Sequence, residues 1–348
     1  MSRAAESVSD IPLTLPTHMP GVDLYIGQTP AMRQVASHIL SVARTERTSV
    51  LLCGETGSGK ELVAGAIHHL SRRATRPFMP INCATIAANL AESELFGSER
   101  GAFTDARLRR GVVEAAHAGT LFLDEIAELS LPVQRTLLRF LETRKFRRLG
   151  SERLLTADIR IIAATWRDLD EAVAQGTFRA DLLFRINVMA ITLPPLRQRK
   201  EDIPAIVSAC LNERSHDTHI GYAPECSPEA IDLLCAYHWP GNVRDLRNVL
   251  ERALVLSRGE TVLPDHLPDA IRRPHHVSPP PQPSPEELLA GLRMPEGGAM
   301  LPDLVRLLEE TLITQAMERA GGNQSEAARI LGLTRDQLRQ RLKRLAFR

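Results

Sequence analysis

Residues 50–61 read Val-Leu-Leu-Cys-Gly-Glu-Thr-Gly-Ser-Gly-Lys-Glu. The stretch begins as an apolar strand and passes through a glycine-rich turn into an amphipathic helical pattern. Glycines at such a turn let backbone N–H groups close around phosphates, and the N-terminus of the following helix favours their negative charge. The stretch therefore predicts a nucleotide-binding loop between a buried strand and a helix, with ATP as the natural ligand.

The loop residues predicted to bind nucleotide are Gly54, Glu55, Thr56, Gly57, Ser58, Gly59, Lys60 and Glu61. Lys60 can reach the terminal phosphates. Glu61 stands where a Ser or Thr hydroxyl usually binds Mg²⁺, so the metal must rely on other groups. The alternative is an ordinary glycine-rich turn without a ligand, but such a turn would not require Lys60.

Two carboxylates follow the apolar strand that ends at residue 124, whose sequence is Thr-Leu-Phe-Leu-Asp. Asp124 is the predicted Mg²⁺ ligand, and Glu125 is predicted to polarise the attacking water. Surface charge is the alternative reading. The phosphate-binding loop upstream favours the functional one.

Apolar runs that alternate with amphipathic stretches predict the fold class of the first half of the chain. The runs are Ser49–Cys53, Phe78–Asn82, Thr120–Asp124, Ile159–Thr165 and Val188–Leu193. This pattern predicts an α/β fold, a parallel sheet with helices on both faces. We expect a flexible N-terminal stub at residues 1–21, the α/β subdomain at 22–195, a helical subdomain at 196–271, a proline-rich linker at 272–300 and a separate helical module at 301–348.

Composition places few limits on function. The 348 residues include 43 Lys and Arg against 42 Asp and Glu, so charge is informative only locally. The five cysteines form no Cys-x-x-Cys pair, which favours reduced core thiols over disulfides or zinc ligands. Neither a signal peptide nor a membrane-spanning run is visible, so we expect a cytoplasmic protein without membrane contact.

The C-terminal module carries the local charge. Residues 323–345 predict two short amphipathic helices around Gly332, the pattern of a helix-turn-helix. The residues predicted to bind DNA are Thr334, Arg335, Gln337, Arg339, Gln340, Arg341 and Lys343. Thr334 is expected to cap the second helix, and the cations to give salt-dependent phosphate contacts. A merely solvated amphipathic helix is the alternative, and the preceding helix at 302–320 is suited to packing or dimerisation.

With these motifs in place, residues 22–348 resemble the bacterial enhancer-binding proteins, the AAA+ activators of sigma-54 RNA polymerase. The loop at 54–61, Glu61 included, and Gly-Thr-Leu-Phe-Leu-Asp-Glu at 119–125 are similar to that family's two nucleotide motifs. Residues 323–345 resemble its Fis-type helix-turn-helix. The resemblance implies an AAA+ P-loop sheet, a helical lid at 196–271, and bound ATP and Mg²⁺. It also suggests a chain without an N-terminal regulatory domain.

Residues 101–106, Gly-Ala-Phe-Thr-Asp-Ala, resemble the family's signature loop, usually Gly-Ala-Phe-Thr-Gly-Ala. The resemblance implies that this loop contacts sigma-54, with Phe103 buried against the partner and Thr104 hydrogen-bonded to it. The contact residues would be Gly101, Ala102, Phe103, Thr104, Asp105 and Ala106. Asp105 replaces a glycine, which removes backbone freedom and adds a charge at the tip. A buried Phe in an ordinary loop is the alternative.

Further family motifs imply residues that act on the nucleotide. Residues 178–185 resemble the arginine-finger stretch, which implies that Arg179 and Arg185 act on the ATP of a neighbouring subunit. Residues 239–246 resemble the second sensor, which implies that Arg244 contacts phosphate. Asn82 matches the residue that couples Glu125 to the nucleotide state. The alternatives are solvated or ion-paired arginines, a helix cap at residue 242, and an asparagine that caps a strand end.

Two motifs depart from the pattern or are ambiguous. Trp166 replaces the usual Asn of the first sensor, and an indole offers one donor and no acceptor. Residues 144–150 correspond to a second pore-facing loop, although a basic hairpin tip in solvent would have the same composition.

The implied function is a sigma-54-dependent transcriptional activator. It would bind upstream enhancer-like DNA, assemble as a homo-oligomer from dimer to hexameric ring, and use ATP hydrolysis to remodel sigma-54 RNA polymerase from the closed to the open promoter complex. A separate regulatory protein acting in trans would fit a chain without a sensory domain. The alternatives are an ATP-responsive DNA-binding regulator that does not remodel sigma-54, and an AAA+ unfolding chaperone, which would leave the helix-turn-helix unexplained.

Overall fold

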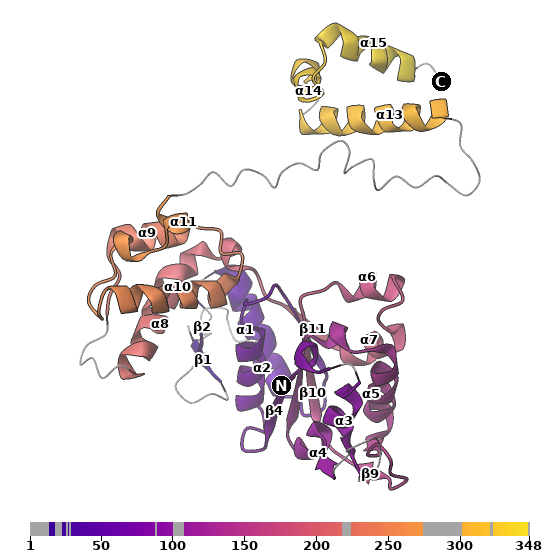
Figure 1. The fold of residues 1–348 in the computed structure, drawn as a ribbon, viewed down its shortest axis with the longest axis vertical. Helices are drawn as coiled ribbons and strands as arrows, with labels where there is room; N and C mark the ends of the chain where they lie inside the picture. Colours follow the sequence, from indigo (N-terminus) through magenta and orange to yellow (C-terminus); the bar gives the residue numbers. More distant parts are fainter. Residues whose placement is uncertain are drawn as a thin grey trace, which may run out of the picture. The chain divides into compact units, whose positions relative to one another are not determined.

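The protein is seen in a computed structural model that describes residues 14–17, 23–25, 27, 29–87, 89–99, 108–217, 224–273, 301–320 and 323–346. The chain divides into two compact units, Met1–His275 and His276–Arg348, which are described separately (Figure 1).

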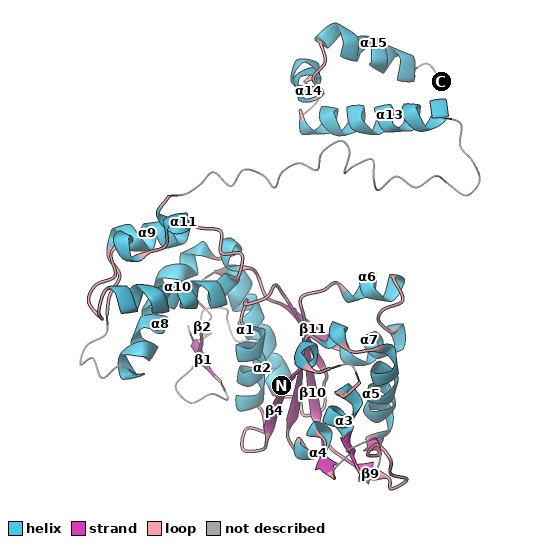
Figure 2. Cartoon of the chain, in the orientation of Figure 1, coloured by secondary structure: helices cyan, strands magenta, loops and turns pink. Residues whose placement is uncertain are grey.

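A five-stranded parallel sheet forms the centre of the first unit (Figure 2). Its strands, in spatial order, are β11 (Met189–Thr192), β3 (Val50–Cys53), β10 (Arg160–Thr165), β7 (Thr120–Asp124) and β4 (Phe78–Asn82). All four neighbouring pairs are parallel, so the carboxyl ends of the strands meet at one edge. The predicted fold class is confirmed.

Helices cover both faces of this sheet, and Figure 1 shows them as two layers. The helices are α1 (Pro30–Ala43) and α2 (Lys60–His69) on one face, and α3 (Ala91–Phe96), α5 (Leu131–Thr143) and α7 (Ala180–Ile186) on the other. Successive strand residues feed opposite cores: Leu51 packs with the α5 side and Leu52 with the α1 side. Burial on both faces explains why the three central strands, β3, β10 and β7, read as continuous apolar runs.

Short elements complete the first unit. They are β1 (Thr14–Pro16), β2 (Asp23–Tyr25), β5 (Gly97–Ser98), β6 (Arg109–Arg110), α4 (Val112–Ala115), β8 (Lys145–Phe146), β9 (Leu155–Thr156), α6 (Leu169–Ala174), and 3-10 turns at Cys83–Thr85, Ile126–Glu128, Leu196–Gln198, Lys200–Asp202 and Pro264–His266. Antiparallel β5 and β6 bracket residues 99–108, and β8 and β9 pair in the same way. Ser98 also bridges to Leu149, so these two hairpins adjoin.

After β11 the first unit continues as a helical subdomain. It contains α8 (Ile203–Asp217), α9 (Pro228–Ala236), α10 (Asn242–Leu256) and α11 (Asp269–Arg272). Their core surrounds the fully buried Trp239, whose indole N–H donates to the Leu234 carbonyl at 2.7 Å. Because the indole donor is satisfied, this large side chain can be buried without an unpaired polar group.

In the described residues of the second unit, three helices form a module: α13 (Leu301–Arg319), α14 (Gln324–Ile330) and α15 (Arg335–Ala346). Its small core includes Ile313, Ala327 and Leu338. Gly332 has φ +65° between α14 and α15, a left-handed conformation that glycine adopts at low cost. The tight turn and the small Ala327 allow the two short helices to cross closely.

Candidate functional site

The glycine-rich loop joins β3 to α2 at the carboxyl edge of the sheet. Gly59 precedes α2 with φ +105°, in the left-handed region. At Gly57, φ is +76° and an added Cβ would lie 2.2 Å from the Gly241 carbonyl oxygen. The loop is therefore pressed against the start of α10, and this approach requires glycine.

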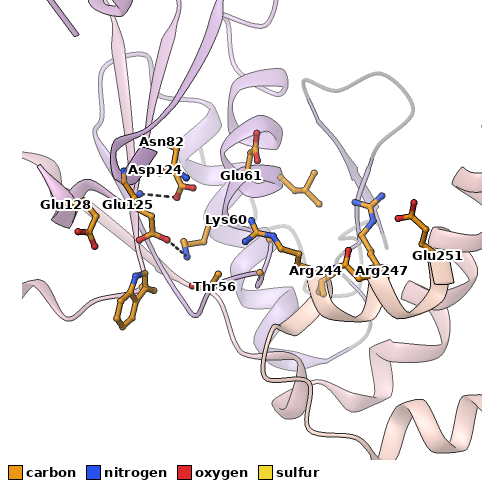
Figure 3. Close-up of a pocket in the computed structure, with 17 residues that line it drawn as sticks. Thr56, Lys60, Glu61, Asn82, Asp124, Glu125, Glu128, Arg244, Arg247 and Glu251 are labelled. Carbon is orange, nitrogen blue, oxygen red and sulfur yellow. Dashed lines mark hydrogen bonds and ion pairs between the residues drawn. The ribbon is translucent and has the colours of Figure 1, made fainter. Parts of the chain in front are cut away.

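Lys60 is held at the mouth of this loop (Figure 3). Its Nζ donates to the carbonyl oxygens of Gly54 at 2.9 Å and Glu55 at 3.4 Å, and lies 3.7 Å from Oε1 of Glu125. Its side chain is 7% exposed. A nearly buried ammonium that faces a cavity is suited to bind phosphate oxygens.

Asp124 and Glu125 lie at the end of β7. Oδ1 of Asp124 accepts a hydrogen bond from the Glu125 backbone N–H at 3.1 Å, and Glu125 adopts φ +53°. Among the described residues, Oε2 of Glu125 has no hydrogen-bond partner. Burial raises the pKa of both carboxyls, and the Lys60 ammonium acts in the opposite direction. A metal ion or a water could use these oxygens.

Asn82 lies beside Asp124 across the β4–β7 register. Its Oδ1 accepts from the Ala84 backbone N–H at 2.9 Å, so its side chain caps the 3-10 turn after β4. It also lines the same cavity as Glu125. The structure thus brings Asn82 into the site, although its side-chain amide oxygen, Oδ1, is already used in the cap.

These groups line one cavity of about 640 Å³, a size typical of small-molecule sites. Glu61 lies on its wall, and the subdomain helix α10 contributes Arg244 and Arg247 (Figure 3). Trp166, 54% exposed, lines the cavity and lies under the Arg167 guanidinium at 5.3 Å. Predicted residues from four separate segments, at 54–61, 82, 124–125 and 244, therefore converge here.

A smaller cavity of about 60 Å³ adjoins the first, and the sequence analysis did not predict it. The two share Gly59, Leu62, Val243 and Arg247 as lining residues. Its other lining residues are Leu24, Tyr25, Ser58, Arg199, Ile206, Ala209 and Cys210. Its wall, assembled mainly from β2, α2 and α8, is mostly apolar, and its volume is that of one or two water molecules. In the sequence, the feature that could have indicated this cavity is the Leu-Tyr pair at residues 24 and 25.

Within the described residues, no group of three His, Cys, Asp or Glu side chains could hold a metal by itself. Mg²⁺ normally takes one or two carboxylates and completes its shell with phosphate oxygens and waters. The donor set of Asp124 beside a phosphate-binding loop fits that requirement.

Arg179 and Arg185 do not line this cavity. Arg179 forms an ion pair with Asp181 (Nη2 to Oδ2, 2.7 Å), and Nη2 of Arg185 donates to the Leu141 carbonyl at 3.1 Å. Between them on α7, Phe184 is 81% exposed. The N-cap and the last turn of α7 therefore carry two cations and an exposed apolar side chain.

The Gly101–Ala106 loop, with Phe103 and Thr104, lies outside the described residues. Its base, however, is described. The Arg148 guanidinium donates to both carboxylate oxygens of Glu114 and to Glu99 at 2.9 Å. Residue 148 lies in the predicted second pore-facing segment, so ion pairs join that segment to the base of the Gly101–Ala106 loop.

In the second unit, Thr334 and Gln337 form a reciprocal cap on α15. Thr334 N–H donates to Gln337 Oε1 at 2.9 Å, and Gln337 N–H donates to Thr334 Oγ1 at 3.3 Å. Arg341 pairs with Glu309 of α13 at 2.6 Å. Arg335, Arg339 and Gln340 are exposed. The Lys343 side chain is not described.

None of the helices in the described ranges is long and apolar enough to cross a membrane.

Comparisons with known proteins agree with this arrangement. Residues 25–192 match a family model described as "Sigma-54 interaction domain", residues 197–284 match "AAA+ ATPase lid domain", and residues 304–345 match "Bacterial regulatory protein, Fis family". Among curated relatives, the regulatory protein AtoC of Escherichia coli is 42% identical over 90% of this chain and 66% of its own length. The transcriptional regulatory protein ZraR of Klebsiella oxytoca is 45% identical over 92% and 68%. The Nif-specific regulatory protein of Klebsiella pneumoniae is 46% identical over 92% and 59%.

Among solved structures, NtrX from Brucella abortus in complex with ADP aligns with a TM-score of 0.65 and 35% identity, over 93% of this chain and 69% of that one. The same protein in complex with ATP gives a TM-score of 0.64. The chain spans about two thirds of the length of the first curated relatives.

Proposed function

The chain belongs to the family of sigma-54-dependent transcriptional activators, which combine a sigma-54 interaction domain, an AAA+ lid and a Fis-family DNA-binding domain, and from this premise we propose that it couples ATP hydrolysis to promoter opening. The observation that carries the proposal is the cavity in which Lys60, Asp124, Glu125 and Arg244 converge.

In this site the triphosphate lies against the glycine-rich loop, with Lys60 and Arg244 neutralising its charge. Asp124 would hold Mg²⁺, which supplies charge neutralisation at the phosphates. Glu125, whose Oε2 is unpaired among the described residues, orients the attacking water. The base would lie against the apolar wall of the adjoining cavity beside Tyr25, which must widen to admit it. Crystals of the related NtrX with ATP and with ADP support this choice of ligand.

A second copy of the chain completes the site. Arg179 and Arg185 lie outside the cavity of their own chain, so either guanidinium would stabilise a transferring phosphoryl group only in the site of a neighbouring copy. Head-to-tail contacts of this kind form a ring when the rotation between neighbouring copies closes. We propose a hexameric ring, with hydrolysis dependent on its assembly.

ATP hydrolysis would then move residues 101–106, and this loop would act on the polymerase. We propose that Phe103 and Thr104 contact sigma-54, and that the Arg148 ion pairs connect the second loop to the base of this one. The C-terminal module holds an upstream DNA site. Partners of this kind put the protein in the cytoplasm.

The test is open-complex formation by purified sigma-54 RNA polymerase, measured by permanganate reactivity of the promoter with the chain and ATP. Phe103→Ala is expected to abolish opening while hydrolysis continues, and Leu108→Ala, an exposed residue just after the loop, serves as the matched control. A chain that hydrolyses ATP but never opens such a promoter would instead be an ATP-responsive DNA-binding regulator.

A further inference from the structure

Asn242, the first residue of α10, lies between the phosphate-binding loop and the helical subdomain. It is fully buried and has φ +54°, a left-handed conformation that asparagine tolerates better than most residues. The helix cap itself is the preceding residue, Gly241, and Asn242 makes no cap. Its side chain therefore does something other than begin the helix.

The Asn242 amide joins three segments of the chain. Its Oδ1 accepts from the Leu196 backbone N–H at 2.7 Å, at the entry to the helical subdomain. Its Nδ2 donates to Glu55 Oε2 at 3.1 Å and to the Thr56 carbonyl at 3.0 Å, both in the phosphate-binding loop. Because Leu196 N–H can only donate and the loop oxygens can only accept, the orientation of the amide is fixed.

The same subdomain supplies donors to the next two loop carbonyls. The Val243 backbone N–H donates to Gly57 O at 3.0 Å, and the buried Arg199 guanidinium donates to Ser58 O at 3.0 Å. Consecutive carbonyls of residues 56–58 are thus all held by the helical subdomain. Their oxygens are thereby drawn toward that subdomain. The backbone N–H groups of Gly54 and Ser58 donate to the carbonyls of Thr165 and Glu55, at 3.2 Å each, so phosphate would be met by the other N–H groups of the loop.

Glu55 has a second anchor. Arg197 forms a two-pronged ion pair with it, at 2.6 and 2.7 Å. This hydrogen bonding, with that of Asn242, lowers the pKa of the Glu55 carboxyl. Glu55 is therefore a charged acceptor that links the loop to two residues of the helical subdomain.

We propose that Asn242 is a positioning residue that holds the phosphate-binding loop in its binding conformation from the helical subdomain, so that phosphate affinity depends on a side chain outside the loop. This inference rests on the proposed function only in that the loop binds nucleotide. Asparagine is required because an Asp at this position would set a carboxylate oxygen against two acceptors, whereas a Gly would keep the backbone and lose the amide.

The experiment measures the ADP dissociation constant of the full chain by calorimetry, at a temperature where circular dichroism shows each variant folded. Asn242→Gly is expected to weaken ADP binding about tenfold, the scale of one or two buried hydrogen bonds. Asn242→Asp is expected to weaken it further. Adding Glu55→Gln to Asn242→Asp reverses donor and acceptor in their contact and should restore part of the affinity. Arg252→Ala, an exposed cation on the same helix, is the control and should bind ADP like the unchanged chain.

Arg197→Ala provides a milder variant, because this side chain is 42% exposed and outside the core. It should weaken ADP binding by a factor of about two to five, since it frees Glu55. ADP affinities within twofold of the unchanged chain for both Asn242→Gly and Arg197→Ala would overturn the inference. This holds also if the two variants lose thermal stability while their ADP affinity stays unchanged. A chain that binds ADP but opens no promoter would contradict the proposed function and leave this inference standing.

Discussion

Nζ of Lys60 lies 3.7 Å from Oε1 of Glu125, and their side chains are only 7% and 14% exposed. Each charge offsets part of the cost of burying the other. The pair also places the phosphate-binding cation next to the carboxylate that is proposed to orient water. Nucleotide binding and hydrolysis can therefore be separated by changing one partner at a time.

Glu125→Gln should reduce the hydrolysis rate by about 10² to 10⁴, the usual contribution of a positioned acid–base group. ATP binding should change little, because Lys60 and the loop remain. Steady-state hydrolysis and calorimetric ATP binding measure the two effects. Glu142→Gln, an exposed residue of α5, is the control, and hydrolysis undiminished by Glu125→Gln would assign the water to another group.

The same substitution should raise the thermal unfolding temperature. Burial raises the folded-state pKa of Glu125 above the ordinary carboxyl value. Between the unfolded and the folded pKa the native state binds more protons, so stability falls as pH rises through this window. At neutral pH the ionised carboxylate therefore destabilises the fold, and Gln removes that cost. Scanning calorimetry at pH 7 and at pH 4 checks the sign, because the gain should be larger at pH 7.

In the pH profile of kcat/KM for ATP hydrolysis, the midpoint of the acid limb should lie above the ordinary glutamate pKa. The free enzyme must hold Glu125 ionised to orient water, and burial raises the pKa at which it loses its charge. A pH series of kcat/KM measures the limb. Loss of the limb in the residual activity of Glu125→Gln would assign it to this carboxyl, while its persistence would point to Asp124, whose pKa is also raised by burial.

The sequence predicted those parts of the nucleotide site that lie in short contiguous motifs. Lys60 and its loop, and the Asp124–Glu125 pair, follow apolar strands, and a parallel sheet brings strand ends to one edge. The adjoining cavity and the Asn242 contacts depend on segments more than a hundred residues apart, which no local pattern encodes. Asn242 entered the sequence analysis merely as a helix cap.

The predictions of DNA-binding residues could not take into account contacts between side chains within the C-terminal module. Gln337 is predicted to bind DNA, and in the structure its amide oxygen caps α15. Arg341 was expected to meet DNA, and it pairs with Glu309 on another helix of the same module. Helical periodicity shows which residues are outward-facing, but it does not show which of them already have a partner.

Mixing two inactive variants should restore hydrolysis if the arginines act on a neighbour. Lys60→Ala loses nucleotide binding but keeps α7 intact, whereas Arg179→Ala keeps the cavity and loses one guanidinium. A mixed ring contains some interfaces with an intact cavity and an intact Arg179, so hydrolysis should reappear on mixing. Rates that merely average the two inactive proteins would contradict action in trans by Arg179. The same test with Arg185→Ala separates the two arginines.

Arg148→Ala should uncouple hydrolysis from promoter opening. The change removes the ion pairs to Glu99 and Glu114 at the base of the Gly101–Ala106 loop, which lie away from the nucleotide cavity. ATP hydrolysis should stay within about threefold, since isolated exposed or half-buried pairs contribute little to stability, while open-complex formation falls strongly. Arg147→Ala, its exposed neighbour, should do neither. Equal loss of both activities in Arg148→Ala would mean that the ion pairs support the ATPase fold instead.

The cations of α15 should divide into two classes by salt dependence. Arg335 and Arg339 are exposed, so each can reach a backbone phosphate. Removing one such contact lowers the magnitude of the slope of log K against log salt by about 0.9. Arg341 is held by Glu309, so Arg341→Ala should also lower the thermal stability of the C-terminal module. Fluorescence anisotropy with duplex DNA at several salt concentrations gives the slopes, and circular dichroism gives the stability. A slope unchanged by Arg339→Ala, with affinity lost at only one sequence, would assign Arg339 to base recognition instead of phosphate contact.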